Sequence, residues 1–132
     1  MSIVLDAHAV LAYVNGEDGG RQVVALVLEA GRDGQRVFMS AVNIAEVFYV
    51  VERKRGAEAV AALPAILDVL SVEAVPADKE LAREAAHLRA SKRMSLADCF
   101  AAALAKSRQA PLVTADPDFK QVEDEVEVVW LG

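Results

Sequence analysis

The sequence predicts an α/β fold, with a mostly parallel five-stranded sheet covered by helices on both faces. Short apolar runs typical of buried strands alternate along the chain with stretches long enough to form helices. Strands separated by helices of this length favour parallel pairing, which places helices on both faces of the sheet. The length of 132 residues and the hydrophobic fraction of 55% suit one domain, spanning residues 1–132, with a buried core.

The N-terminal elements follow this alternation. Ile3–Leu5 is a short apolar run that predicts the first strand, and Ala7–Val14 continues with apolar residues over a helical length. The polar and glycine-rich segment Asn15–Gly20 breaks that pattern. Val23–Ala30 then predicts a mostly buried helix, which we expect Gly31 to stop.

The middle of the chain contains the second strand and the longest predicted helix. Arg36–Met39 predicts the strand, and Ser40 can cap a helix over Ala41–Arg55 that ends at the following glycine. Another helix follows to about Leu70. Within it, Pro64 is either a kink or the first residue of a new segment.

The C-terminal part contains three predicted strands and two helices. Asp78 and Ser95 each precede a helical stretch and can cap it, the first running to about Ser91 and the second to about Arg108. The predicted strands are Ser71–Val75, Pro111–Thr114 and Val126–Leu131. We find no internal repeat and no linker between domains.

Composition limits the compartment and the class of partner. The single cysteine, Cys99, excludes an intramolecular disulfide, and neither a signal peptide nor a membrane span is evident. We therefore expect a soluble, cytoplasmic protein that does not contact membranes. The net charge of −6 argues against a simple DNA-binding module. It does not exclude a nuclease whose positive charge comes from bound metal ions.

Three acidic residues stand alone in stretches that are otherwise uncharged. They are Asp6 within Met1–Gly16, Glu46 within Val37–Val51, and Asp98 within Met94–Ala105. A carboxylate in such a stretch is expected on or beside the buried face of its element, where an unpartnered charge costs several kcal/mol or shifts its pKa. Three of them in a small domain call for a shared explanation.

A metal site provides that explanation. Asp6 directly follows the first predicted strand, and Asp116 lies two residues after the fourth. In a doubly wound sheet, ligands bind beyond the carboxyl ends of the strands, where the strand order reverses. If the first and fourth strands flank that point, Glu46 in the second turn of its helix and Asp98 in the first turn of its own can reach the same crevice. Carboxylates without clustered His or Cys predict a hard cation, Mg²⁺ or Mn²⁺.

Each acid also has a purely structural alternative. Asp6 can be the N-cap of the helix that follows it, and Asp116 before a proline can be another. Ser95 and Asp98 have the spacing of a capping box. Glu46 has the weakest alternative, because its helical neighbours are uncharged, whereas a solvated glutamate normally has charged ones.

These residues together resemble a PIN domain of the VapC toxin type. The resemblance covers Ile3 to about Trp130 and rests on motifs in a fixed order. They are Asp6 after the first strand, Ala45-Glu46-Val47, Ser95-Leu96-Ala97-Asp98, and Leu112-Val113-Thr114-Ala115-Asp116-Pro117-Asp118-Phe119. The resemblance implies a five-stranded parallel sheet between helices and a metal-dependent endoribonuclease that hydrolyses RNA with metal-activated water. Asp6, Glu46, Asp98 and Asp116 would then be its catalytic and metal-binding residues.

The resemblance also suggests secondary residues and partners. Thr114 corresponds to a threonine that orients the site, and it is equally well a strand residue. The family often has Ser or Thr where this chain has His8, which either donates a hydrogen bond within the site or packs against the core. Asp118 is an extra carboxylate or a solvated turn residue. Expected partners are an antitoxin that presents Arg or Lys to the acids, and a second copy of the chain in a homodimer.

Basic residues near the ends of two helices can hold the RNA backbone or lie in solvent. They are Arg53, Lys54, Arg55, Lys92 and Arg93. The alternative function is a PIN-like scaffold or RNA-binding module without catalytic activity. A haloacid-dehalogenase-type phosphatase is disfavoured, because it needs a second aspartate two residues after Asp6. The acidic pair and central phosphoacceptor of a response-regulator receiver are also not evident.

Overall fold

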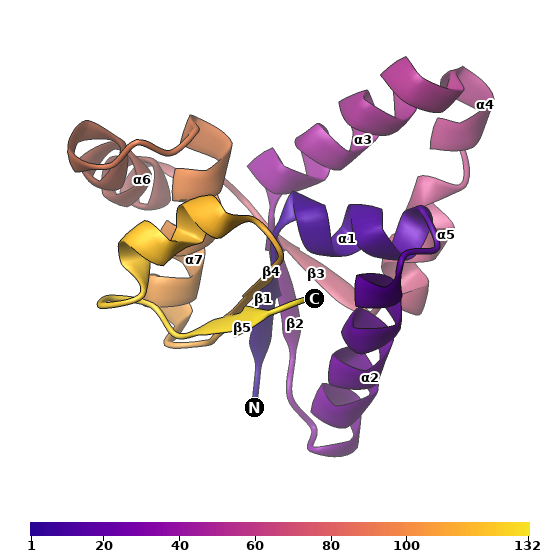
Figure 1. Ribbon diagram of the computed structural model, residues 1–132, viewed down its shortest axis with the longest axis horizontal. Coiled ribbons are helices and arrows are strands. Elements are labelled where there is room, and N and C mark those ends of the chain that lie inside the picture. Colours follow the sequence, from indigo (N-terminus) through magenta and orange to yellow (C-terminus); the bar gives the residue numbers. More distant parts are fainter.

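Five parallel strands form the central sheet, in the order β3-β2-β1-β4-β5 (Figure 1). The computed structural model describes residues 1–132. The strands are β1 (Ile3–Leu5), β2 (Val37–Ser40), β3 (Val72–Val75), β4 (Leu112–Thr114) and β5 (Val128–Trp130). The predicted α/β fold is therefore confirmed, and every strand pair is parallel.

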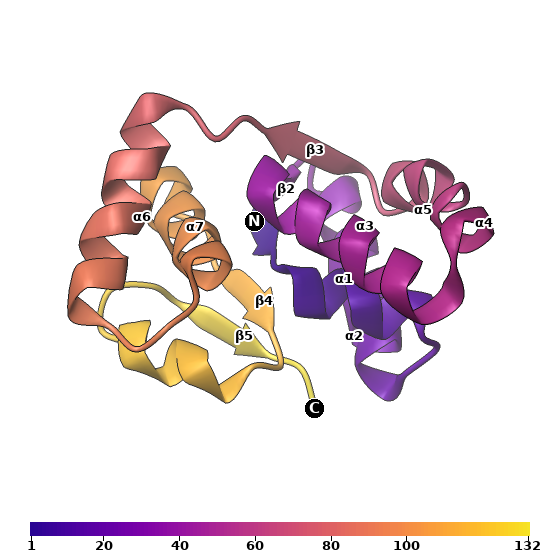
Figure 2. The same cartoon turned by 90° about the horizontal axis from the view of Figure 1, so that it is seen from above.

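Helices cover both faces of this sheet. Figure 2 shows α6, α7 and the short 3₁₀ helix η1 on one side, and α1, α2, α3, α4 and α5 on the other. The helices are α1 (Ala7–Val14), α2 (Asp18–Arg32), α3 (Ala41–Arg55), α4 (Ala57–Val60), α5 (Leu63–Val69), α6 (Lys79–Ser91), α7 (Leu96–Arg108) and η1 (Pro117–Val122). None of them is long and apolar enough to span a membrane.

The strand residues alternate between two hydrophobic cores, one on each face. Val4 and Phe38 pack with α6 and α7, whereas Leu5 and Met39 pack with the helices of the other face. This alternation follows from the two-residue period of a strand. Because every residue of β1, β2 and β4 is buried, these strands appear in the sequence as continuous apolar runs.

Two helical segments differ from the sequence prediction. The helix expected over Val23–Ala30 is longer than predicted. It includes Gly19 and Gly20, which were expected to break the helical pattern, and Gly31, which was expected to end it. A Cβ atom at Gly20 would lie 2.7 Å from the carbonyl oxygen of Ala12, so the missing side chain lets α2 approach the backbone of α1. In the second segment, Pro64 lies in the first turn of α5, where its missing N–H costs no helical hydrogen bond.

The strand order reverses between β1 and β4. From β1 the chain proceeds to β2 and β3 on one side, then crosses to β4 and β5 on the other. The carboxyl ends of β1 and β4 are therefore adjacent, with Leu5 paired to Val113. This arrangement is the one that the sequence analysis required for Asp6 and Asp116 to meet.

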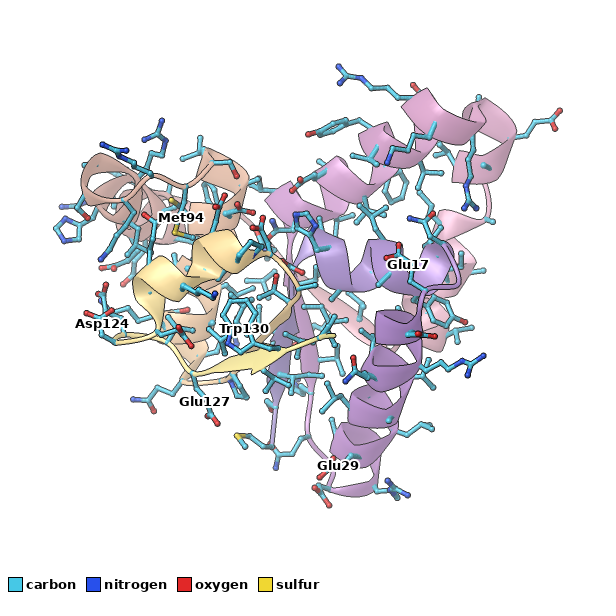
Figure 3. All side chains as sticks on the ribbon, viewed as in Figure 1. Glu17, Glu29, Met94, Asp124, Glu127 and Trp130 are labelled. Carbon is cyan, nitrogen blue, oxygen red and sulfur yellow. The ribbon has the colours of Figure 1, made fainter.

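Acidic side chains lie mostly on the surface. Figure 3 labels four of them, Glu17, Glu29, Asp124 and Glu127, and all four are exposed. Two acidic residues are buried as whole residues, Asp6 and Asp98.

Candidate active site

The buried polar residues gather at one end of the sheet. They follow a strand directly, end a strand, or lie in the first turn of a helix at that end. They are Asp6, Ser40, Asn43, Asp98 and Thr114. The rest of the buried residues are hydrophobic, so this edge is where the protein places polar groups out of solvent.

Asp6 is held firmly by the fold. It is the N-cap of α1, and its Oδ1 accepts a hydrogen bond of 2.8 Å from the backbone N–H of Ala9. Its Oδ2 accepts a hydrogen bond from the hydroxyl of Thr114. Burial raises the pKa of Asp6 to about 7, against the lowering effect of these two hydrogen bonds. The capping alternative is thus correct for Asp6, but each oxygen keeps a free lone pair for a cation.

Thr114 links Asp6 to Asp116. Its hydroxyl donates to the carboxylate of Asp6 and accepts a hydrogen bond of 3.0 Å from the backbone N–H of Asp116. The side chain is fully buried at the end of β4. Thr114 therefore orients two of the acids, in addition to being a strand residue.

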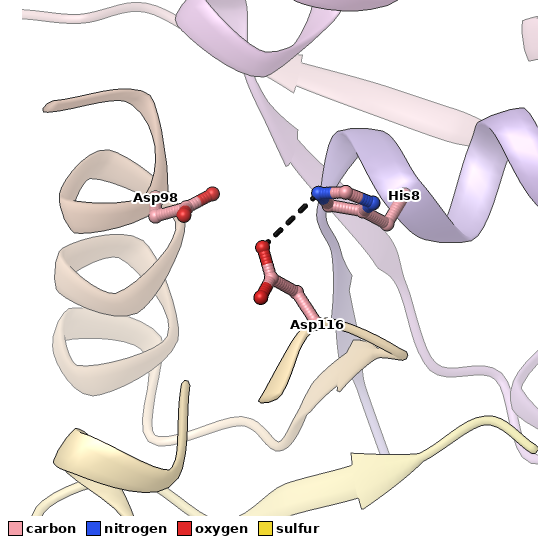
Figure 4. Close-up of side chains that lie close together, drawn as sticks. All are labelled: His8, Asp98 and Asp116. Carbon is pink, nitrogen blue, oxygen red and sulfur yellow. Dashed lines mark ion pairs between the residues drawn. The ribbon is translucent and has the colours of Figure 1, made fainter. Parts of the chain in front are cut away.

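His8, Asp98 and Asp116 meet at one point (Figure 4). One donor atom from each lies within 4.8 Å of the others, and His8 Nε2 is 3.2 Å from Asp116 Oδ2. We call these residues the three-residue cluster. The other oxygen of Asp116 caps η1 through the N–H of Asp118. Asp118 itself is exposed and lies outside the cluster.

Asp98 differs from Asp6 in what its carboxylate contacts. Its backbone N–H donates to the Ser95 hydroxyl at 3.1 Å, but the backbone N–H of Ser95 does not donate to the Asp98 carboxylate in return. The spacing therefore gives a simple N-cap by Ser95 and not a full capping box. Burial is the largest cause that raises the pKa of Asp98, and together with the negative charges of Asp116 and Glu46 it brings that pKa to about 6.

Glu46 lies next to this cluster on α3. Its negative charge acts on Asp98, but its carboxylate is not among the donor atoms that lie within 4.8 Å of each other. One oxygen, Oε1, is buried and has no hydrogen-bond partner. An unpartnered buried acceptor is costly, so Glu46 is poised for a proton donor or a cation that the chain itself does not supply.

Asn43 is a residue that the sequence analysis did not select. It is fully buried one turn before Glu46, and its Nδ2 donates a hydrogen bond of 3.0 Å to the carbonyl of Ala97. This bond ties α3 to the first turn of α7, where Asp98 lies. The available signal was a lone amide in the apolar run between Phe38 and Glu46.

The basic residues are less well placed for a substrate. Arg53–Arg55 begin two helical turns after Glu46, roughly 10 Å along the axis of α3. The last of them donates to the side chain of Asn15 at 2.8 Å. Lys92 lies 3.8 Å from the carboxylate of Glu125. These contacts support the structural alternative for Arg55 and Lys92.

The residues at this edge fit a divalent cation. Several carboxylates and an imidazole lie together, and two of the carboxylates have pKa values raised by burial or by each other. A positive charge would offset that repulsion and give the unpartnered oxygen of Glu46 a favourable neighbour. The donors are mainly oxygen atoms, which hard divalent ions prefer.

The fold and this site define a class of protein: an open parallel α/β domain with an acidic cluster at the point where the strand order reverses. A family model described as the PIN domain matches residues 3–125. The chain belongs to the PIN domain family. No curated protein sequence matches it.

Several solved structures are similar over nearly the whole chain. The structure of VapBC2 from Rickettsia felis, bound to a promoter DNA fragment, is 17% identical with a TM-score of 0.78, and covers 100% of both chains. VapC20 from Mycobacterium tuberculosis, a sarcin–ricin loop cleaving toxin, is 21% identical with a TM-score of 0.70, covering 91% of this chain and 94% of its own. VapBC-5, from a toxin–antitoxin family of the same organism, is 25% identical with a TM-score of 0.63, covering 98% and 97%.

Proposed function

We propose that this chain is a divalent-metal-dependent endoribonuclease that acts in the cytoplasm as the toxin of a toxin–antitoxin pair. The observation that carries the proposal is the convergence of Asp6, Glu46, Asp98 and Asp116 at the strand-order reversal of a PIN domain. The similarity to VapC20, a toxin that cleaves an RNA loop, supports RNA as the substrate class.

The surroundings of each side chain suggest its role in the proposed site. Asp98 and Asp116 contribute carboxylate oxygens to the three-residue cluster, so they would bind the cation directly. Asp6 and Glu46 complete the negatively charged site. The hydroxyl of Thr114 fixes the positions of Asp6 and Asp116 relative to each other, because it hydrogen-bonds to both residues. When bound, a divalent cation activates water and offsets the charge of a phosphodiester. The acids themselves would repel RNA, so substrate binding depends on that positive charge.

The proposed partners follow from the same charges. An antitoxin that presents Arg or Lys to the acidic site would neutralise it and block RNA, and the similar VapBC structures are of toxin–antitoxin systems. We also propose a homodimer, as the family resemblance implies. Purification of the tagged chain from its native cells should recover a small protein whose binding weakens at high salt. Recovery of the chain alone would count against the toxin role.

Activity with Mg²⁺ or Mn²⁺ tests the nuclease directly. The purified chain should cleave RNA with either ion and stop when EDTA is added. Glu46→Gln keeps the shape of the side chain and removes its charge, so it should lower the cleavage rate by roughly 100-fold or more. Glu52→Gln changes an exposed residue of the same helix and should cleave like the wild type. Undiminished cleavage in EDTA would refute the metal mechanism.

A further inference from the structure

We infer that His8 binds the divalent cation directly and gives the site a preference for Mn²⁺ over Mg²⁺. The inference rests on the metal site of the proposed function and not on RNA cleavage. It concerns a residue at which this chain departs from the Ser or Thr that is common in its family.

The surroundings of His8 are those of a ligand and not of a packing residue. The neighbours Ala7, Ala9 and Val10 form the buried face of α1, whereas the His8 side chain is 46% exposed. Its Nε2 points at Asp116 (Figure 4). The packing alternative from the sequence analysis is therefore wrong.

The spacing of the donor atoms suits a shared ion. Two neighbouring ligands at roughly 2.1 Å from an octahedral cation lie about 3 Å apart, and two opposite ones about 4.2 Å. The 3.2 Å between His8 Nε2 and Asp116 Oδ2 matches neighbouring ligands. The limit of 4.8 Å that includes Asp98 slightly exceeds the distance between opposite ligands. A small movement of these side chains would close that difference.

The chemistry of imidazole determines which ion benefits. Mg²⁺ prefers oxygen ligands and gives up its water reluctantly, so it gains little from a nitrogen donor. Transition-metal ions accept imidazole readily, and carboxylates suit Mn²⁺ as well. A site with carboxylates and one imidazole therefore favours Mn²⁺, whereas a hydroxyl in the same place would not distinguish the two ions in this way.

Calorimetric titration of three proteins with Mn²⁺ and with Mg²⁺ tests this. The proteins are the wild type, His8→Ser, and the control His87→Ser, which removes the only other histidine from an exposed position on α6. His8→Ser should weaken Mn²⁺ binding at least about tenfold, since losing even a residue that only orients a ligand costs that much. Mg²⁺ affinity should change far less, and His87→Ser should match the wild type.

The opposite change in metal affinity is expected if His8 only forms an ion pair with Asp116. In that case the imidazole competes with the cation, and His8→Ser should bind both ions more tightly. Tighter or equally weakened binding of both ions overturns the inference, as does a wild type that binds neither ion.

A second measurement needs no variant. The ¹⁵N chemical shifts of the two histidine rings can be followed in the wild type with Zn²⁺ as a diamagnetic probe. The Nε2 signal of His8 should move to the range of metal-bound nitrogen while His87 stays unchanged, and an unmoved His8 signal overturns the inference. RNA cleavage separates the two proposals. If His8 binds the ion but RNA is not cleaved, the proposed nuclease function is refuted and this inference stands. If RNA is cleaved but Mn²⁺ is not preferred, this inference is refuted and the nuclease function stands.

Discussion

The end of β1 and the first turn of α7 each bury an aspartate, and the two differ in what satisfies the carboxylate. Asp6 is 1% exposed and accepts hydrogen bonds on both oxygens, from Ala9 and Thr114. Asp98 is 6% exposed, and the Ser95 hydroxyl is the hydrogen-bonding neighbour of its carboxylate, while the negative charges of Asp116 and Glu46 lie beside it. Asp6 is therefore held by hydrogen bonds at both oxygens, whereas Asp98 lies among negative charges that a bound cation would offset.

Removing the side chain of Asp6 should have the largest effect on stability. At pH 3.5 Asp6 is protonated in the folded state, where its pKa lies near 7, and mostly protonated in the unfolded state, where it is near 3.8, so the measurement reports mainly capping and hydrogen bonding. Asp6→Ala removes the N-cap and leaves the buried Thr114 hydroxyl without its acceptor, which should cost about 2–4 kcal/mol of unfolding free energy. Urea denaturation measures it.

A matched control shows how much of that loss is capping. Asp78 caps α6 through a bond of 2.9 Å to the N–H of Leu81, without a buried partner comparable to Thr114. Asp78→Ala should cost about 1 kcal/mol. Equal losses in the two variants would show that the hydroxyl of Thr114 adds nothing.

The pH dependence should be large in the absence of metal. The folded pKa values of Asp6, about 7, and of Asp98, about 6, exceed the ordinary 3.8, so the folded state binds more protons than the unfolded state between these limits. Stability should therefore fall as pH rises from about 4 to 7, by up to about 1.4 kcal/mol per pH unit for each group. Melting curves in EDTA at pH 5 and pH 8 measure the fall.

The same melting curves measured with Mn²⁺ in place of EDTA give the comparison. The cation favours the ionised carboxylates, so the difference between pH 5 and pH 8 should shrink when it is present. In EDTA, Asp98→Asn should also have a shallower pH dependence than the wild type, because one of the two shifted groups is gone. A slope unchanged by both treatments would show that these carboxylates do not titrate as their surroundings predict.

The smallest change in metal-free stability is expected from Asp98→Asn at pH 7.5. Removing one of several neighbouring negative charges relieves repulsion worth on the order of 1 kcal/mol, so the variant should melt at the wild-type temperature or above it. It should also lose much of the increase in melting temperature that Mn²⁺ gives the wild type, because a ligand stabilises only the state that it binds. A destabilised variant that keeps the full Mn²⁺ increment would show Asp98 to be structural only.

Most of the fold could be predicted from local sequence patterns. The apolar strands, the caps at Ser40, Asp78 and Ser95, and the adjacency of the first and fourth strands were predictable, because each depends on a few neighbouring residues or on a general rule of parallel sheets. The course of α2 through Gly19 and Gly20 was not. It depends on how closely the backbone of α1 approaches, which no window of sequence contains.

The candidate site also contains residues that the sequence predicts and contacts that it does not. Asp6, Glu46 and Asp98 were predictable because each interrupts an apolar stretch. Asp116 was predictable because it follows β4, whose carboxyl end lies beside that of β1. The orientation of His8 and the bond from Asn43 to Ala97 depend on side-chain conformations across different elements. Such contacts link residues up to 108 positions apart, and sequence spacing cannot reveal them.

The pairing of β1 with β4 has a consequence for the timing of synthesis. Asp6 and Thr114 are 108 residues apart, so the ribosome must make most of the chain before the first of the site's groups meets its partner. A nascent chain that ends before Leu112 lacks Thr114 and Asp116 and also the strand that aligns them with β1. Translation products that end before Leu112 therefore cannot assemble the acidic site, and any activity that depends on this site requires a chain made at least to Asp116.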